Sequence, residues 1–94
     1  MPLYALIARQ PEPERRQRAR PAHLEHMNRL NEAGRVQYGG PLLDGDNAVG
    51  SLIIVEAESL GDAKATFARD PYLVEDVFER YEILETKQIY PRQA

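Results

Sequence analysis

The sequence predicts an α+β fold in which strands and helices follow the order βαββαβ. Three observations predict it. Four short apolar runs are typical of strands, and two longer segments repeat apolar residues at helical spacing. Glycine, proline and aspartate separate these segments, as expected for turns. With 94 residues, the chain has the size of one small domain, and we expect a single domain over residues 1–94.

The first strand is predicted at residues 3–8, where the apolar run LYALIA is closed by Pro11 and Pro13. Two helical pieces are expected to follow. The first covers residues 14–20 and is polar. Pro21 then fits the first turn of the second piece, a position that accepts proline.

The second helical piece is predicted from Ala22 to Gly34, because glycine is a typical residue just beyond a helix C-terminus. His23 points close to the centre of its apolar face, whereas His26 lies nearer the edge. We therefore expect His23 to face the protein interior. The apolar side chains that define this face are Leu24, Met27, Leu30 and Ala33.

Two strands are predicted on either side of a turn at residues 44–47, with the sequence DGDN. The first covers residues 36–43, and Pro41 within it favours an edge position or a bulge. The second covers residues 48–58 and is the clearest strand pattern in the chain.

A second helix is predicted to begin at Ser59, whose side chain can cap it, with Asp62 three residues further on. It ends at Asp70, because a residue that precedes proline avoids helical backbone angles. A turn or short helix is expected over residues 72–77. The apolar face of the helix that begins at Ser59 is formed by Leu60, Ala63 and Phe67.

The last strand is predicted over residues 78–90, which completes the ferredoxin-like order. In that fold two helices cover one face of an antiparallel four-stranded sheet. Both faces of the first and third strands are nevertheless apolar in residues 3–8 and 49–57. Since a sheet covered on one side should have a polar second face, we expect the second face to pack against a second copy of the chain as a homodimer.

Composition excludes several classes of protein. The chain has no cysteine, which excludes disulfides, thiolate metal sites and cysteine nucleophiles. The net charge is −3, and the only basic cluster spans residues 15–20. We interpret this cluster as a solvated helical turn. We therefore expect no nucleic-acid binding. The sequence shows no targeting segment and no apolar run long enough to span a membrane, so we expect a cytoplasmic protein with no membrane partner.

His23 and Asp70 are the first candidates for chemistry. Histidine is a typical general acid or base near neutral pH, and the chain has only two histidines. The alternative for His23 is a hydrogen-bonded core residue without a chemical role. Asp70 can point back towards the end of the sheet, or it can be a local turn residue.

Ser51 shares a strand face with aliphatic residues, so its hydroxyl needs either a backbone partner or a ligand. His23 and His26 are three residues apart, but no third ligand follows at metal-binding spacing, and we expect no metal. The glycine pair at residues 39–40 does not match a phosphate-binding loop. We expect no cofactor.

The segment Arg20-Pro21-Ala22-His23-Leu24 resembles the RPAHL motif of the YCII-related (YciI-like) family. The resemblance continues at matching intervals through residues 34–35, 40–41, 50–51, 58–63 and 70–72. It implies a ferredoxin-like fold that pairs as a dimeric α/β barrel. It also implies similarity to muconolactone isomerase and to a dehydrochlorinase of chlorinated hydroxyhydroquinones. In such proteins a histidine–aspartate pair is the proposed catalytic centre, and His23 and Asp70 stand at those motif positions.

We therefore expect a small cofactor-independent enzyme of lyase or isomerase type, in which Asp70 orients His23 and His23 moves a proton. Arg20, Ser51 and Tyr72 are expected to contact an anionic or phenolic substrate. One alternative is a module that binds a small ligand without catalysis. Another is a regulatory protein that binds its partner through the acidic second half of the chain.

Overall fold

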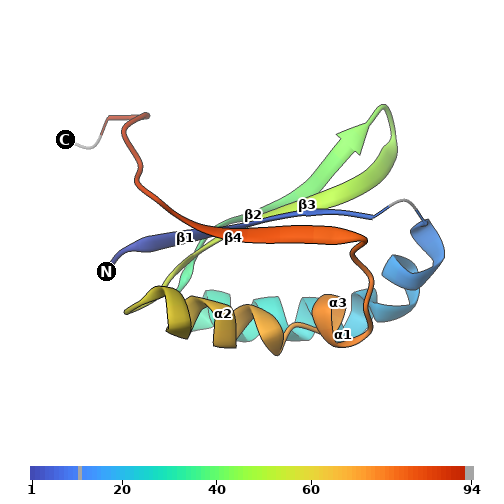
Figure 1. Cartoon of the computed structure of the whole chain (residues 1–94), viewed down its shortest axis with the longest axis horizontal. Coiled ribbons are helices and arrows are strands. Elements are labelled where there is room, and N and C mark those ends of the chain that lie inside the picture. The colour runs from blue at the N-terminus through green and yellow to red at the C-terminus, as the bar shows by residue number, and fades with distance from the viewer. Residues whose placement is uncertain (11, 93–94) are drawn as a thin grey trace.

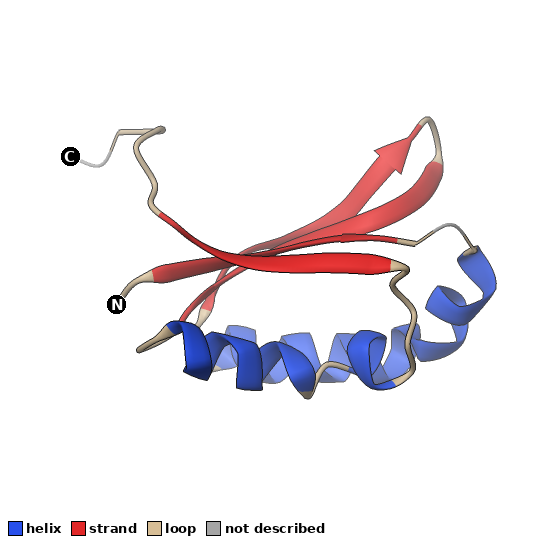
Figure 2. Cartoon of the chain, in the orientation of Figure 1, coloured by secondary structure: helices blue, strands red, loops and turns tan. Residues whose placement is uncertain are grey.

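The elements follow the predicted order, with a short helix before the last strand (Figure 1). The structure is a computed structural model that describes residues 1–10 and 12–92. The four strands form one antiparallel sheet in the spatial order β2-β3-β1-β4, and the helices lie on one of its faces (Figure 2). The predicted ferredoxin-like fold is therefore confirmed. The elements are β1 (Leu3–Arg9), α1 (Pro13–Glu32), β2 (Val36–Asp44), β3 (Asn47–Glu56), α2 (Leu60–Ala68), α3 (Pro71–Val74) and β4 (Arg80–Thr86).

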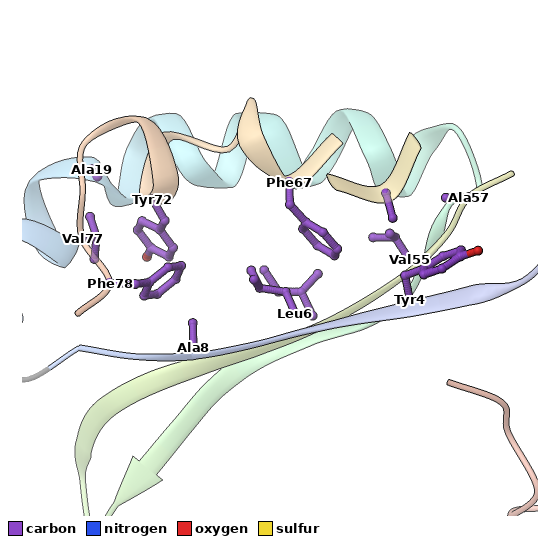
Figure 3. Packing of buried hydrophobic residues seen from close by; sticks show 12 residues of the cluster. Tyr4, Leu6, Ala8, Ala19, Val55, Ala57, Phe67, Tyr72, Val77 and Phe78 are labelled. Atoms are coloured by element: carbon purple, nitrogen blue, oxygen red, sulfur yellow. The ribbon is translucent and has the colours of Figure 1, made fainter. Parts of the chain in front are cut away.

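The hydrophobic core lies between the sheet and the helices (Figure 3). Alternate residues of β1 point towards the helices, and Phe67 points from α2 towards Leu6. Successive side chains of a strand face opposite sides, so these alternate residues share one face of β1, and that face is buried. The buried core residues on this face of the two central strands are Tyr4, Leu6, Ala8, Ile53 and Val55, and buried Ala57 directly follows β3.

The opposite face of the sheet has no helix over it in the described part of the chain (Figure 1). It is nevertheless apolar, as the sequence predicts. Tyr38 on β2 is 49% exposed and Leu84 on β4 is 50% exposed. Between them, Leu52 and Ile54 of β3 are partly buried. We call this surface the open face.

The first helix is one continuous element, so the prediction of two helical pieces separated at Pro21 is wrong. Pro21 lies inside α1, where it removes one backbone hydrogen bond to the carbonyl of Gln17. Both residues are exposed, so water can satisfy that carbonyl. Burial of Ala19 and His23 on either side of the proline favours one helix over two. Figure 2 shows the first turns of α1 inclined to the rest, as expected for a helix that contains proline.

The apolar face predicted for α1 is only partly buried. Leu24 is exposed because it faces a cavity between α1 and the sheet. Ala33 is exposed because it is the C-cap, where the chain leaves the helix. Gly34 follows with a φ of 74°, which explains the predicted glycine stop.

The second helix begins as predicted, since the Ser59 hydroxyl accepts a hydrogen bond of 3.1 Å from the backbone N–H of Asp62. Ala63 and Phe67 are buried on its inner face. Leu60, predicted on the same face, is instead exposed at the first position of α2.

Two strands are shorter than predicted, and one cause explains both. Leu3, the first residue of β1, pairs with Glu56 of β3 on one side and Thr86 of β4 on the other. Beyond these residues one more backbone bond forms, 3.1 Å from the N–H of Ala57 to the carbonyl of Pro2, and the pairing with β1 then ends, so β3 does not reach residue 58 and β4 does not reach residue 90. After β4 the chain leaves the sheet on the side opposite the helices (Figure 1). Of the prolines predicted to close β1, Pro13 begins α1 and Pro11 lies outside the described residues.

Candidate functional site

Two side chains that are far apart in the sequence meet between α1 and α3. Nδ1 of His23 lies 2.8 Å from Oδ1 and 3.0 Å from Oδ2 of Asp70. His23 is 9% exposed and Asp70 is completely buried. Because a carboxylate only accepts hydrogen bonds, this contact needs a proton on Nδ1, so that in the neutral form of the imidazole the lone pair is on Nε2. The expected inward direction of His23 is correct, and the structure brings the two motif residues together.

Asp70 is held in place because it also caps α3. Its Oδ1 accepts a hydrogen bond of 2.9 Å from the backbone N–H of Tyr72. Pro71 supplies the first helical position, where its missing N–H costs nothing. Asp70 is therefore a turn residue, as one interpretation of the sequence holds, and a partner of His23 at the same time.

The ring of Tyr72 fixes the plane of the imidazole. The Tyr72 and His23 rings stack with centroids 3.7 Å apart and an angle of 9° between their planes. Phe78 supports Tyr72 from the edge, with centroids 5.6 Å apart. Burial raises the pKa of the Tyr72 phenol, and Asp70 adds to the effect while Arg16 and Arg20 oppose it. The phenol is therefore protonated at neutral pH and can donate a hydrogen bond.

A cavity of about 520 Å³ lies between α1 and the inner face of β2 and β3. Its volume falls within the usual range for small-molecule sites, about 300–1,000 Å³. His23, Arg20, Ser51 and Tyr72 all line it, so four of the five predicted site residues reach one space. Asp70 does not line the cavity but lies behind His23. Apolar lining residues are Leu24, Met27, Val36 and Ile53.

Arg16 is a lining residue that the sequence interpretation missed. Its guanidinium carbon lies 5.0 Å from the centre of the Tyr72 ring. Burial lowers the pKa of Arg16 and Arg20 adds to this, while Tyr72 and Asp70 oppose it. Helical spacing could have revealed it, since residues 16, 20, 23 and 27 share one face of α1. The basic cluster is thus divided: Arg15 and Arg18 are exposed, whereas Arg16 is half-buried.

His26, the second histidine, lies one turn beyond His23 and is half-buried. Its Nε2 is covered and has no hydrogen-bond partner among the described residues. Burial lowers the pKa of His26, and the nearby Asp70 carboxylate opposes that shift. Within residues 1–10 and 12–92, no group of three or more histidine, aspartate or glutamate side chains is placed to hold a metal ion. Over the same residues, no helix combines the length and the apolar character needed to cross a bilayer.

The family model of the YCII-related domain matches residues 1–87. The chain belongs to the YCII-related family. Protein YciI of Escherichia coli is 33% identical over 84 residues, which cover 82% of this chain and 86% of YciI. The resemblance carried by the RPAHL segment is therefore confirmed.

Two further similar proteins have names that describe chemistry. Derivative of benzaldehyde biosynthesis cluster protein C of Emericella nidulans is 39% identical over 67 residues, 63% of this chain and 68% of that protein. Among solved structures, the 5-chloro-2-hydroxyhydroquinone dehydrochlorinase TftG of Burkholderia phenoliruptrix, in complex with 2,5-dihydroxybenzoquinone, superposes with a TM-score of 0.81. It is 25% identical, and the match covers 90% of this chain and 93% of TftG.

Proposed function

We propose that the protein is a small enzyme that moves protons on a small molecule without a cofactor, as lyases and isomerases do. The observation that carries the proposal is the contact of His23 Nδ1 with the Asp70 carboxylate, at 2.8 and 3.0 Å, in the wall of the cavity. A general base needs a partner that fixes its tautomer and a reacting group within reach. The relationship to TftG, itself a dehydrochlorinase, supports chemistry of this kind.

In this mechanism Nε2 of His23 takes a proton from the bound substrate, and the buried Asp70 carboxylate stabilises the imidazolium that forms. His23 then returns the proton. Delivery to another carbon of the same molecule completes an isomerisation, and delivery to a departing group completes an elimination. Tyr72, stacked on the imidazole, keeps Nε2 directed at one position throughout.

The remaining predicted residues would bind the substrate. The Tyr72 phenol and the Ser51 hydroxyl are hydrogen-bonding groups in the cavity wall, and Arg20 brings a positive charge. Together they suit a phenolic or anionic molecule. A dihydroxybenzoquinone in the related TftG supports this class of ligand.

We propose further that the protein works as a homodimer whose two sheets face each other across the open face. Tyr38 and Leu84 expose about half of their side chains there, and Ile7 lies between them on β1 with 37% exposed. Large contiguous apolar patches on a protein surface mark interfaces. A second copy offers the same patch and would cover this one.

The test is turnover of a panel of chlorinated and unchlorinated hydroxyhydroquinones, followed by chloride release and by exchange of ring protons with solvent. The wild-type protein should turn over at least one, and His23→Gln should be slower by about 10² to 10⁴. His26→Gln is the matched control, because it changes the neighbouring histidine of the same helix and should keep most of the activity.

Two results would overturn the proposal. Equal activity of wild type and His23→Gln would remove His23 from the chemistry. A wild-type protein that binds these phenols, exchanges none of their protons and releases no chloride would be a ligand-binding module.

A further inference from the structure

Arg16 is held rigidly at the edge of the cavity by neutral groups. Its Nη1 donates to Oε1 of Gln10 at 2.8 Å and to the backbone carbonyl of Gly50 at 2.9 Å. Gln10 is buried and is itself fixed, since its Nε2 donates to the carbonyl of Ala48 at 2.7 Å. The Tyr72 ring lies beneath the guanidinium. The head group of this long side chain is therefore pre-positioned rather than mobile.

The anchor points lie on the sheet or directly at its edge: Gly50 is in β3, and Gln10 follows the last residue of β1, with its N–H bonded to the carbonyl of Val49 at 3.0 Å. The backbones of β1 and β3 run so close at Gly50 that a Cβ there would collide with the carbonyl oxygen of Ala8. Glycine permits this close approach of the two strands. The carbonyl of the same glycine accepts the hydrogen bond from Arg16. A site built on strands holds its geometry more tightly than one built on flexible segments.

Most of the donors of Arg16 are unused. A guanidinium has five N–H donors, and the two bonds at Nη1 account for two of them, so three remain on Nε and Nη2. His26 Nε2 is the one buried side-chain nitrogen or oxygen of the described residues that has no hydrogen-bond partner. The free nitrogens of Arg16 are therefore not sealed in protein, and Arg16 lines the cavity.

The charge of Arg16 is also unmatched. Among the residues that the structure describes, the ion pairs involve Arg15, Arg29 and Arg35 but neither Arg16 nor Arg20. The described residues that line the cavity include no aspartate or glutamate. This positive site lies in a chain whose net charge is −3. A pair of arginines without carboxylate partners in a partly enclosed cavity favours an anion.

We infer that Arg16 selects the ligand by its charge. Its guanidinium binds an anionic oxygen of a molecule whose apolar part lies against Leu24, Met27 and Ile53. This inference rests on the proposed function in taking the same cavity as the substrate site. It adds a residue that sequence motifs do not assign, and it names the class of ligand: a flat amphipathic anion, such as a carboxylate or phenolate on an aromatic ring.

The experiment compares benzoate with benzamide, two probes of nearly the same shape that differ in charge. Calorimetry or NMR titration at neutral pH and low salt gives both dissociation constants. The wild-type protein should bind benzoate about tenfold or more tightly than benzamide, because a charge-assisted hydrogen bond contributes about 1.5–3 kcal/mol and tenfold corresponds to about 1.4 kcal/mol. Arg16→Gln should abolish that preference and leave benzamide binding within about twofold.

Arg18→Gln is the matched control, because Arg18 lies two residues away on the exposed side of α1 and does not line the cavity. It should keep the preference for benzoate. Arg16→Lys keeps the charge without the planar fork of donors and should retain part of the preference.

A purely structural role for Arg16 predicts equal losses of benzoate and benzamide binding, and that result would overturn the inference. A wild-type protein that binds the two equally, or binds neither, would overturn it as well. Because the measurement needs no turnover, anion selectivity in a protein without activity would contradict only the proposed function. Activity that depends on His23, combined with unchanged selectivity in Arg16→Gln, would contradict only this inference.

Discussion

Asp70 holds His23 through the same carboxylate that caps α3. Its Oδ1 lies 2.8 Å from Nδ1 of His23 and accepts the Tyr72 N–H at 2.9 Å, although His23 is 47 residues away in the chain. One buried carboxylate thus joins the middle of α1 to the start of α3. Stability and the orientation of the imidazole depend on the same group, so changes at Asp70 should affect both.

Replacing Asp70 with asparagine should slow turnover and weaken the fold together. The amide has nearly the shape of the carboxylate but no charge, and it can present N–H to Nδ1, which favours the other tautomer of His23. Turnover should fall by about 10² to 10⁴. The free energy of unfolding, measured in urea, should fall by about 1–3 kcal/mol.

The control for this prediction is Asp46→Asn, an exposed position in the turn between β2 and β3. It should change the free energy of unfolding by less than about 0.5 kcal/mol. An Asp70→Asn protein with wild-type turnover would show that the contact between Asp70 and His23 serves the fold alone.

The phenol of Tyr72 should ionise above its ordinary pKa of 10.0, because burial opposes its charged form. The folded protein then holds this proton more tightly than the unfolded chain does. The resulting contribution to stability is present below about pH 10 and is lost as the pH rises through the folded-state pKa. Tyr72→Phe has no such proton and should lose less stability at alkaline pH.

Ultraviolet titration checks this directly. The difference between the tyrosinate absorbance of wild type and of Tyr72→Phe isolates the Tyr72 phenol. A midpoint at or below 10.0 would be inconsistent with its burial beside His23.

Replacing His26 with methionine should stabilise the protein. Nε2 of His26 is covered without a partner in the described structure, and an apolar side chain there removes that penalty, for a gain of about 1 kcal/mol. Burial lowers the pKa of His26 below 6.5. The corresponding stability is present above pH 6.5 and is lost as the pH falls through the folded-state pKa.

Urea unfolding at pH 7 and at pH 5 measures both effects. The His26→Met protein should be more stable at pH 7 and lose less stability than wild type on acidification. A lower stability at pH 7 would mean that His26 makes contacts that methionine cannot replace.

The open face should carry the dimer contact. Leu84→Glu places a charge on that face, on the edge strand β4 beside Ala5 of β1, and should convert a dimer into a monomer by light scattering at micromolar concentration. Val74→Glu is the control, because Val74 is an exposed apolar residue on the helical side of the molecule. A monomeric wild-type protein at the same concentration would contradict the homodimer.

The sequence predicts the fold well because its signals are local. Alternating apolar residues, a serine that caps a helix and a glycine that ends one are each read within a few residues, and Ser59 and Gly34 are found in those roles. Strand ends are different. Where β3 and β4 stop depends on where β1 begins, and that pairing joins residues more than fifty positions apart.

The sequence predicts the candidate site only in part, as it does the fold. Helical spacing directs His23 inward, but no local pattern states that Asp70 is its partner, because the contact depends on how α3 packs against α1. The resemblance to a family supplied that pairing. Arg16 was missed because an arginine among other arginines is typical of a solvated surface; its burial depends on Gln10 and Gly50, which come from two other strands or strand ends.

The tautomer of His23 tests the central claim most directly, namely that Asp70 presents His23 to the cavity with Nε2 free to take a proton. Nitrogen-15 NMR of the histidine side chains, above the pH at which imidazole is charged, distinguishes the two neutral forms without any knowledge of the substrate. His23→Gln assigns the signals, and Asp70→Asn tests their cause. The wild-type protein should show His23 protonated at Nδ1, and Asp70→Asn should lose that preference. A wild-type His23 protonated at Nε2 would contradict the account, because no lone pair would then be available on the side of the ring opposite Asp70.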